Sequence, residues 1–306
     1  MATITGQVAS FAALKVAIET TLSSRGWTLA NGILSKGAAF VQFTATATEL
    51  RLQAGTGQAG AALTGFSPQS VKVMTFTNAP IQWPAVYVLH VFDAPDEVYC
   101  VLRYNVDRHQ HVNFGLSTMP QIGGTGLWCT GSFRGDVDGT RAGVKVFIDS
   151  NSGTQLGAQP YDGFGLGFFF ASIAGTYHSS FIHCGLEGPA AWRTSVGGAA
   201  GELLGVSHKA GLLHALPSAF NQATVLLPID VLLARQAQGQ TIVATLAHAR
   251  YCRLDHLDLS QPLLYGPERW AAYPLHAVHP VQRNGAGWST GAQHSGTFGV
   301  ALRDTP

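Results

Sequence analysis

Two consecutive apolar runs in the middle of the sequence restrict the fold more than any other feature. Residues 86–92 (VYVLHVF) and 97–104 (EVYCVLRY) are rich in β-branched and aromatic side chains, which favour strands. The residues between them, 93–96 (DAPD), are typical of a tight turn. The two runs therefore predict a β-hairpin, and a hairpin joins antiparallel strands.

Similar strand patterns recur along the chain, at residues 40–46, 49–53, 111–116, 127–133 and 144–148. Glycine and proline separate the later ones, which predicts an antiparallel meander that continues from the hairpin. The apolar runs at 224–235 and 241–253 are compatible with helix or strand, because their periodicity does not distinguish the two. Residues 203–216 are expected to be a short helix or irregular.

One helix is expected close to the N-terminus. Ser10 is a suitable N-cap and Gly26 supplies a stop signal. Between them, apolar residues recur at the spacing of one helix face: Phe11, Leu14, Ile18 and Leu22. Together these patterns predict a β-rich α+β fold, in which an N-terminal helix is followed by a mainly antiparallel sheet with hairpins and long loops.

We divide the chain into three segments on the same patterns. Residues 1–80 hold the helix and the first strands, and residues 81–200 hold the antiparallel meander. Residues 201–306 form a mixed C-terminal lobe, either separate or continuous with the middle segment. We expect no leader sequence and no membrane span, since the least charged stretch, 163–186, is interrupted by glycine and polar residues.

Charged residues are scarce and balanced. The chain has 18 basic and 17 acidic residues, or 11%, with a net charge of +1; soluble domains average about 25% charged residues. This balance excludes electrostatic binding to nucleic acid or to an anionic membrane as the main function. A monomer of this mass exposes about 12,000 Å², so we expect large apolar patches unless neighbouring subunits cover them.

The excess of arginine over lysine has two explanations. Protein interfaces favour arginine and disfavour lysine, so the 13 arginines and five lysines fit a chain that is embedded in an assembly. A genome rich in G and C gives the same bias without any interface.

Residues 55–60 (GTGQAG) match the glycine pattern of dinucleotide sites directly after an expected strand. Such a site needs a helix that begins at the last glycines and an acidic residue about 20 positions later. Here Pro68 follows, and no Asp or Glu occurs between Glu49 and Asp93. We therefore expect an inter-strand loop and no cofactor.

A histidine pair is the main candidate for metal binding. His109 and His111 alternate along one face of an expected strand, with Asp107 in phase and Asn105 beyond it, and His90 could add a third ligand across the sheet. The favoured alternative is an exposed or hydrogen-bonded polar face. A metal-dependent hydrolase is the corresponding, less favoured function.

Other chemistry is sparse. Asp93, Asp96 and Glu97 could act as paired carboxylates, but their position around a turn favours a solvated hairpin tip. The sequence has no nucleophile elbow, zinc-protease motif or phosphate-binding loop, so we predict that the protein is not an enzyme. The tryptophans could be glycan-stacking platforms or core residues: Trp27, Trp83, Trp128, Trp192, Trp270 and Trp288.

Two stretches resemble a known class of protein. The first comprises residues 83–92 (WPAVYVLHVF), 95–99 (PDEVY), 103–107 (RYNVD), 114–117 (FGLS) and 124–128 (GTGLW). The second comprises residues 266–274 (GPERWAAYP) and 294–303 (HSGTFGVALR). Together they cover about a quarter of the chain and are similar to virion structural proteins of tailed bacteriophages, in particular to tail and neck components.

The resemblance implies a non-enzymatic subunit that is copied around a symmetric particle. The narrower expectation is a ring at the tail end or neck, such as a tail terminator, whose partners are other copies of itself and other virion proteins. It also implies assembly in the host cytoplasm and a final location in the virion. Known terminators are often shorter, so a baseplate, capsid-decorating, or receptor- or glycan-binding module is the alternative.

The hairpin and the C-terminal segment are the elements that we expect to form subunit interfaces. Their candidate interface residues are Trp83, Tyr87, Phe92, Tyr99, Arg103, Tyr104, Trp270, Phe298 and Arg303. We assign no catalytic, cofactor-binding or metal-binding residue.

Overall fold

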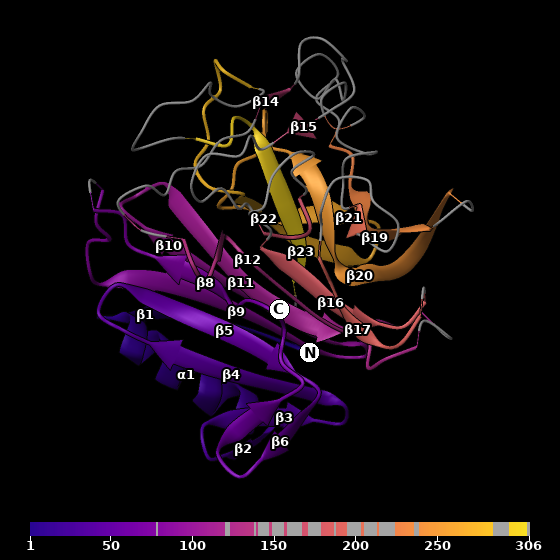
Figure 1. Ribbon diagram of the computed structural model, residues 1–306. Coiled ribbons are helices and arrows are strands. Elements are labelled where there is room, and N and C mark those ends of the chain that lie inside the picture. The colour runs from indigo at the N-terminus through magenta and orange to yellow at the C-terminus, as the bar shows by residue number, and fades with distance from the viewer. Residues whose placement is uncertain are drawn as a thin grey trace.

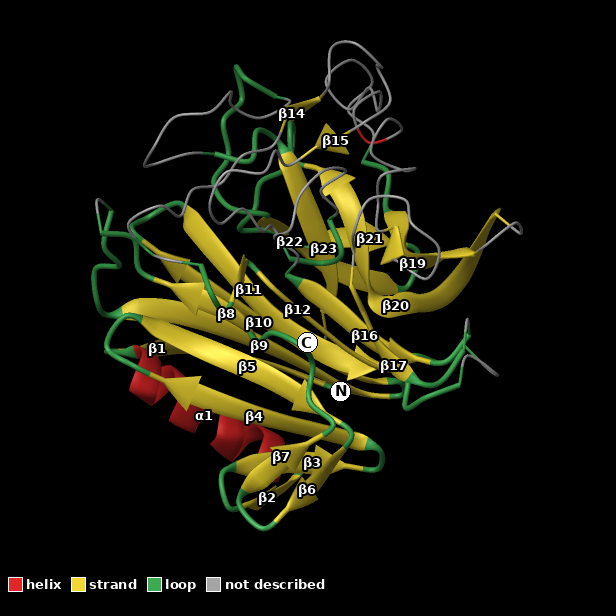
Figure 2. Ribbon diagram, in the orientation of Figure 1, coloured by secondary structure: helices red, strands yellow, loops and turns green. Residues whose placement is uncertain are grey.

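Three large antiparallel β-sheets make up most of the described part of the computed structural model, and they lie in layers (Figures 1 and 2). The structure describes residues 1–77, 79–119, 123–137, 139, 147–148, 156–157, 167–170, 179–186, 188–194, 203–204, 213, 224–235, 239–283 and 294–304. The β-rich α+β class predicted from the sequence is confirmed.

The sheets are named here by their place in the layers. The central sheet has the order β1 (Ala2–Val8), β9 (Ala85–Asp93), β10 (Asp96–Tyr104), β11 (Arg108–Leu116), β12 (Leu127–Gly131), β16 (Ser180–Cys184) and β17 (Ala191–Thr194). The N-terminal sheet has the order β13 (Phe133–Arg134), β8 (Val71–Met74), β5 (Glu49–Gly55), β4 (Ala39–Ala45), β3 (Ile33–Lys36) and β2 (Thr28–Ala30).

The C-terminal sheet has the order β18 (Leu203–Leu204), β19 (Leu227–Arg235), β20 (Gly239–Arg253), β23 (Phe298–Asp304), β22 (Glu268–Pro274) and β21 (Leu263–Tyr265). Two short ribbons complete the described strands: β6 (Gly57–Ala59) with β7 (Ala62–Thr64), and β14 (Phe147–Ile148) with β15 (Leu156–Gly157). The ambiguous runs at 224–235 and 241–253 are therefore strands, and they pair with each other as β19 and β20.

The expected helix is present as α1 (Phe11–Ser23). The Ser10 hydroxyl accepts a hydrogen bond from the amide of Ala13 at 3.1 Å, as an N-cap does. The four residues of the predicted apolar face are all buried: Phe11, Leu14, Ile18 and Leu22. Among the described helices, none is long and apolar enough to cross a membrane.

The predicted hairpin is confirmed as β9 and β10, which pair from Asp93 opposite Asp96 to Val86 opposite Arg103. Both faces of this hairpin are covered. Val98 and Leu102 pack toward α1 and the N-terminal sheet, whereas Tyr99 and Val101 pack toward the C-terminal sheet. Burial on both faces explains why the two strands are almost continuously apolar instead of alternating.

The boundary expected at residue 80 does not separate two units. β1, from the first segment, pairs along its whole length with β9 from the second, and β13 pairs with β8 through Phe133 and Lys72. Residues 1–200 thus contribute to one pair of packed sheets, while residues 203–304 supply the C-terminal sheet. The mixed lobe expected there consists mainly of strands in its described residues, and most of 203–216 and 144–148 lies outside them.

A buried ion pair ties β8 of the N-terminal sheet to the segment after β13. The Lys72 ammonium, with a side chain 2% exposed, donates to Glu49 Oε2 at 2.5 Å and to the carbonyl oxygens of Gly135 and Val137 at 3.1 and 2.6 Å. Glu49 also accepts a hydrogen bond from Arg51. All three ammonium protons therefore have acceptors, which offsets the cost of desolvating the charge.

Lys72→Met should destabilise the fold by about 3–5 kcal/mol, because it leaves the Glu49 carboxylate buried without its main counter-charge. Urea unfolding at pH 7 measures this. The matched control is Lys36→Met, since Lys36 binds Asp93 and Asp96 from a partly exposed position and should cost less than about 1 kcal/mol. Equal losses in the two variants would contradict the structural role of Lys72.

Candidate functional site

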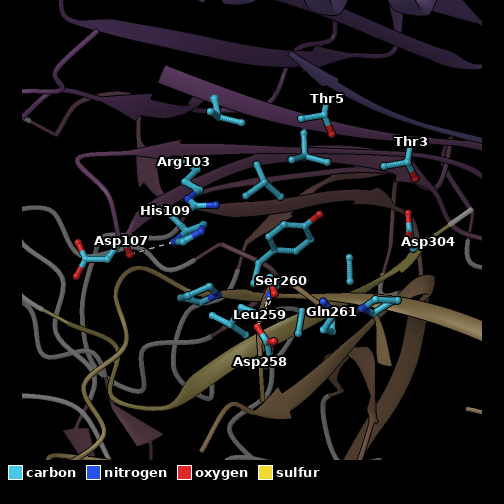
Figure 3. Close-up of a pocket in the computed structure, with 18 of the residues that line it drawn as sticks. Thr3, Thr5, Arg103, Asp107, His109, Asp258, Leu259, Ser260, Gln261 and Asp304 are labelled. Carbon is cyan, nitrogen blue, oxygen red and sulfur yellow. Dashed lines mark hydrogen bonds between the residues drawn. The ribbon is translucent and has the colours of Figure 1, made fainter. Parts of the chain in front are cut away.

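A cleft of about 620 Å³ lies between the β1 side of the central sheet and the C-terminal sheet (Figure 3). One wall is formed by β1, β9 and β10, including Thr3, Thr5, Val86, Val88, Val101 and Arg103. The other wall is formed by β22, the end of β23 and the segment 258–262. The first and last described strands of the chain thus meet at the same cleft.

Charged side chains line both walls of the cleft. In Figure 3, Arg103, Asp107 and His109 lie together at one end and Asp304 lies at the other. Asp304 accepts a hydrogen bond from Arg269 at 3.3 Å, and the exposed Arg103 donates through Nε to the carbonyl of Val106 at 3.3 Å. The lining therefore carries both signs of charge and does not select for a strongly charged ligand.

His109 is the titratable group most enclosed at the first end. Its side chain is 7% exposed, and Nδ1 donates to the carbonyl oxygen of Asp107 at 3.2 Å. Burial lowers the pKa of His109 to about 4, so the ring is neutral at pH 7. Its partner is a backbone carbonyl, and this hydrogen bond favours the protonated ring, but burial outweighs it.

One arrangement at the cleft resembles a catalytic relay. The hydroxyl of Thr3 lies 3.1 Å from Nδ1 of His90, and Nε2 of the same ring lies 2.9 Å from the Tyr273 hydroxyl. Burial lowers the pKa of His90 to about 4, which makes it a weak general base at neutral pH. The third member is a neutral phenol, whereas hydrolytic triads use a carboxylate to stabilise the imidazolium. The relay is better suited to holding β1, β9 and β22 together.

Six of the nine candidate interface residues lie inside the chain's own core, with side chains at most 9% exposed: Tyr87, Phe92, Tyr99, Tyr104, Trp270 and Phe298. The expectation that these six contact another subunit is therefore corrected. Tyr87 and Tyr104 are covered by α1 and the N-terminal sheet, and Phe92, Tyr99 and Phe298 lie between the central and C-terminal sheets. Trp270 is buried in a smaller cluster formed by β20, β22 and β23.

The remaining three candidates keep part of their surface. Arg103 is exposed at the cleft, and Arg303 is partly exposed and paired with Glu268 at 3.0 Å. Trp83 is partly buried, and its ring packs edge-on against Phe11 with centroids 5.1 Å apart. These three side chains do not gather at one site, and only Arg103 lines the cleft.

The histidines suggested for a metal site point to separate hydrogen-bond partners. Nε2 of His111 donates to the carbonyl oxygen of Pro274 at 2.8 Å, His109 bonds the backbone of Asp107, and His90 bonds Thr3 and Tyr273. Within the described residues, no group of three or more His, Cys, Asp or Glu side chains is placed to hold a metal. The polar-face interpretation describes them better, although the face is buried.

The structure also describes the glycine-rich segment and most of the tryptophans. The glycine-rich segment 55–60 is not a loop: it leads into the β6–β7 ribbon, where the Thr56 amide donates to the Thr64 carbonyl at 3.0 Å. Trp27, Trp128 and Trp270 are buried, and Trp288 lies outside the described residues. Trp192 is partly exposed, with its indole nitrogen bonded to the Gly65 carbonyl at 2.7 Å. Among the five described tryptophans, only Trp83 and Trp192 keep part of their surface.

Glu97 was expected at a solvated hairpin tip, but it is completely buried between the central and C-terminal sheets. Its carboxylate accepts hydrogen bonds from the amides of Ala247 and His248, at 2.8 and 2.9 Å, and from the Tyr99 hydroxyl at 2.7 Å. These two amides are available because residues 247–249 of β20 have no partner on β19 at a register shift. An acidic residue just inside an apolar strand is the sequence signal that marks such a position.

Burial raises the pKa of Glu97 to about 7, and its hydrogen bonds oppose that shift. The other two carboxylates do lie at the tip: Asp93 and Asp96 both bind Lys36. The two aspartates therefore form ion pairs at the tip of the hairpin, whereas Glu97 is buried, because β10 is covered by the C-terminal sheet from that residue onward.

Comparison with protein-family models finds no match for the chain, and comparison with curated proteins finds none either. The geometry of the sheets and the cleft therefore carries the functional inference.

The raised pKa of Glu97 makes folding stability depend on pH. A carboxyl group with a folded pKa near 7 and an ordinary value of 4.5 stabilises the fold most below pH 4.5, and this contribution is lost as the pH rises through 7. From pH 5 to pH 8 the loss from this group is about 2–3 kcal/mol.

Glu97→Gln should lack this dependence, so the difference in unfolding free energy between wild type and variant should shift by that amount in favour of the variant as the pH rises. Urea unfolding at pH 5, 6, 7 and 8 measures the difference, in which contributions from all other groups cancel. Parallel pH profiles for the two proteins would rule out a titrating Glu97.

Proposed function

We propose that this chain is a non-enzymatic structural subunit of a tailed-bacteriophage virion, which assembles with other copies into a ring at the tail end or neck. The observation that carries this proposal is that β1 is an edge strand beside the cleft, with neither charge nor proline to protect its free edge. The resemblance of the short stretches within residues 83–128 and 266–303 to tail and neck components supports the same class.

β1 offers a free edge to a partner. It pairs only with β9, and its backbone makes no hydrogen bond to any other element in the described part of the chain. Its seven residues, Ala2–Val8, include no charge and no proline, which are the usual devices that protect an edge from pairing. Thr3 and Thr5 line the cleft next to it. An extended segment of a neighbour could pair with β1 and place side chains in the cleft.

A second free edge lies on the C-terminal sheet. β21 ends that sheet and pairs only with β22, and its Leu264 and Tyr265 side chains are 73% and 64% exposed. A closed ring needs two different surfaces on each subunit. The edges of β1 and β21 provide two such surfaces, and the 11% charged residues of the chain fit surfaces that are covered in an assembly.

This proposal sets the expected partners and location. The partners are other copies of the chain and other virion proteins, and assembly takes place in the host cytoplasm before the subunit resides in the virion. No cofactor takes part. A baseplate or capsid-decorating position would use the same two edges, and symmetry measured on the assembly distinguishes these positions.

Charge on the β1 edge should block assembly. Thr5→Lys combined with Gln7→Lys places two ammonium groups on exposed positions of β1. An incoming neutral strand would offer these two charges no acceptor, so the concentration needed for assembly should rise at least about tenfold. Light scattering coupled to size exclusion over a range of concentrations measures this.

The matched control is Thr20→Lys, which adds a lysine at an exposed position of α1 away from β1 and should assemble like the wild type. A wild-type chain that stays monomeric at every concentration, or an edge variant that assembles normally, would refute the proposed role of β1.

A further inference from the structure

Five histidines lie along the contact between the central sheet and the C-terminal sheet, and we call them the histidine seam: His90, His109, His111, His248 and His276. Each is at most 7% exposed. The chain has 12 histidines and His90 is the first of them, so α1 and the N-terminal sheet contain none. Titratable imidazoles are thus concentrated at one of the two sheet contacts.

His276 is held in one protonation state by its neighbours. The amide of His109 donates to the His276 carbonyl at 2.7 Å, and Nδ1 of His276 donates to the His109 carbonyl at 3.1 Å. The other ring nitrogen, Nε2, therefore accepts from Arg108 Nη1 at 3.3 Å. A proton added to Nε2 would point a cationic N–H at a guanidinium group and remove this bond.

His111 is held in one state by a different arrangement. Its Nε2 donates to the Pro274 carbonyl at 2.8 Å, so Nδ1 is unprotonated. Nδ1 is buried and has no hydrogen-bond partner among the described residues. A proton added there would create a charged donor with no acceptor, which is costly in a dry interior.

The other three histidines also join the two layers or line their cleft. His90 bridges Thr3 of β1 and Tyr273 of β22. The His248 ring stacks on Phe92 with centroids 3.9 Å apart, and its Nε2 bonds the Ala94 carbonyl at 3.3 Å. Burial lowers the pKa of His90, His109 and His248 to about 4, and that of His111 and His276 to about 3.

Other titratable and charged groups face the histidine seam from every neighbouring element. The groups that interact with the seam histidines through their charge or a hydrogen bond are Arg103, Asp107, Arg108, Arg250, Glu268, Arg303, Asp304 and Tyr273. Asp304, Asp107 and Glu268 favour protonation, but burial outweighs them in each case. Glu97 acts in the opposite direction, because its raised pKa makes the closed contact bind one proton that the separated sheets release.

We propose that the histidine seam is an acid-labile joint: on acidification below about pH 6, the C-terminal sheet separates from the central sheet and, without the shared core, loses its own strand pairing, while α1, the N-terminal sheet and the central sheet stay folded. Histidines whose pKa is lowered in the closed state stabilise the contact above pH 6.5, and this stabilisation is lost as the pH falls. Five imidazoles gain protons on opening and Glu97 loses one, so opening takes up about four protons. The equilibrium constant for opening then rises by up to about 10⁴ per pH unit.

Hydrogen–deuterium exchange of the full chain between pH 7.5 and 4.5, corrected for the intrinsic pH dependence of exchange, tests this joint. Peptides from β22 and β23 should lose protection below about pH 6, with a steepest slope near four protons. Peptides from α1, β4 and β5 should remain protected over the same range. Loss of protection in all sheets at one pH, or none in β22 and β23 down to pH 4.5, would overturn the proposal.

Two variants isolate the titrating groups. His276→Asn retains an N–H in the place of Nδ1, and His111→Gln retains one in the place of Nε2, but neither side chain titrates. Each should lower the slope by about one proton and move the opening to lower pH. The matched control is His183→Gln in β16, because His183 bonds Thr125 and packs near Trp192 away from the histidine seam; it should leave the slope unchanged.

A measurement on the wild type keeps the test independent of these variants. Exchange at the imidazole C2 position gives the titration midpoint of each histidine. In the closed protein the five seam histidines should stay unprotonated until β22 and β23 lose protection. Titration of these five near pH 6.5 without that loss would overturn the joint.

Discussion

Burial of the central sheet on both faces is the constraint on which the rest of this structure depends. β9 and β10 have α1 and the N-terminal sheet on one side and the C-terminal sheet on the other. A layer in this position has no solvent to satisfy its polar side chains, so each one needs a partner inside the protein. The C-terminal sheet supplies these partners: two amides of β20 for Glu97, the Tyr273 phenol for His90 and the Pro274 carbonyl for His111.

The two contacts of the central sheet are chemically different. Toward α1 and the N-terminal sheet it is held by aliphatic and aromatic packing, with the Lys72–Glu49 pair nearby. Toward the C-terminal sheet it combines apolar packing with a buried carboxylate and five imidazoles. Apolar burial does not depend on pH, whereas the second contact does. We therefore expect the first contact to persist on acidification and the second to respond to it.

The cleft lies where the second contact ends, beside the strand that the proposed assembly would use. β1 and β23 meet there, so a strand added along β1 would also touch the C-terminal sheet. The β1 edge is neutral and the lining is balanced in charge, which suits an uncharged extended segment of another subunit. An acid-labile joint beside such an edge would couple the state of the C-terminal sheet to the contact between subunits.

The sequence by itself determined the local elements: α1 with its Ser10 cap, the β9–β10 hairpin and the strands that continue from it. These depend on periodicity and turn residues within a few positions, which are readable along the chain. It did not determine the layers. Glu97 was assigned to solvent and six aromatic side chains to subunit interfaces, because a short segment does not reveal which distant strands cover it. Only the tertiary structure, by packing the three sheets on one another, decided that these groups are interior, and it placed β1 and β21 among the strands at the sheet edges.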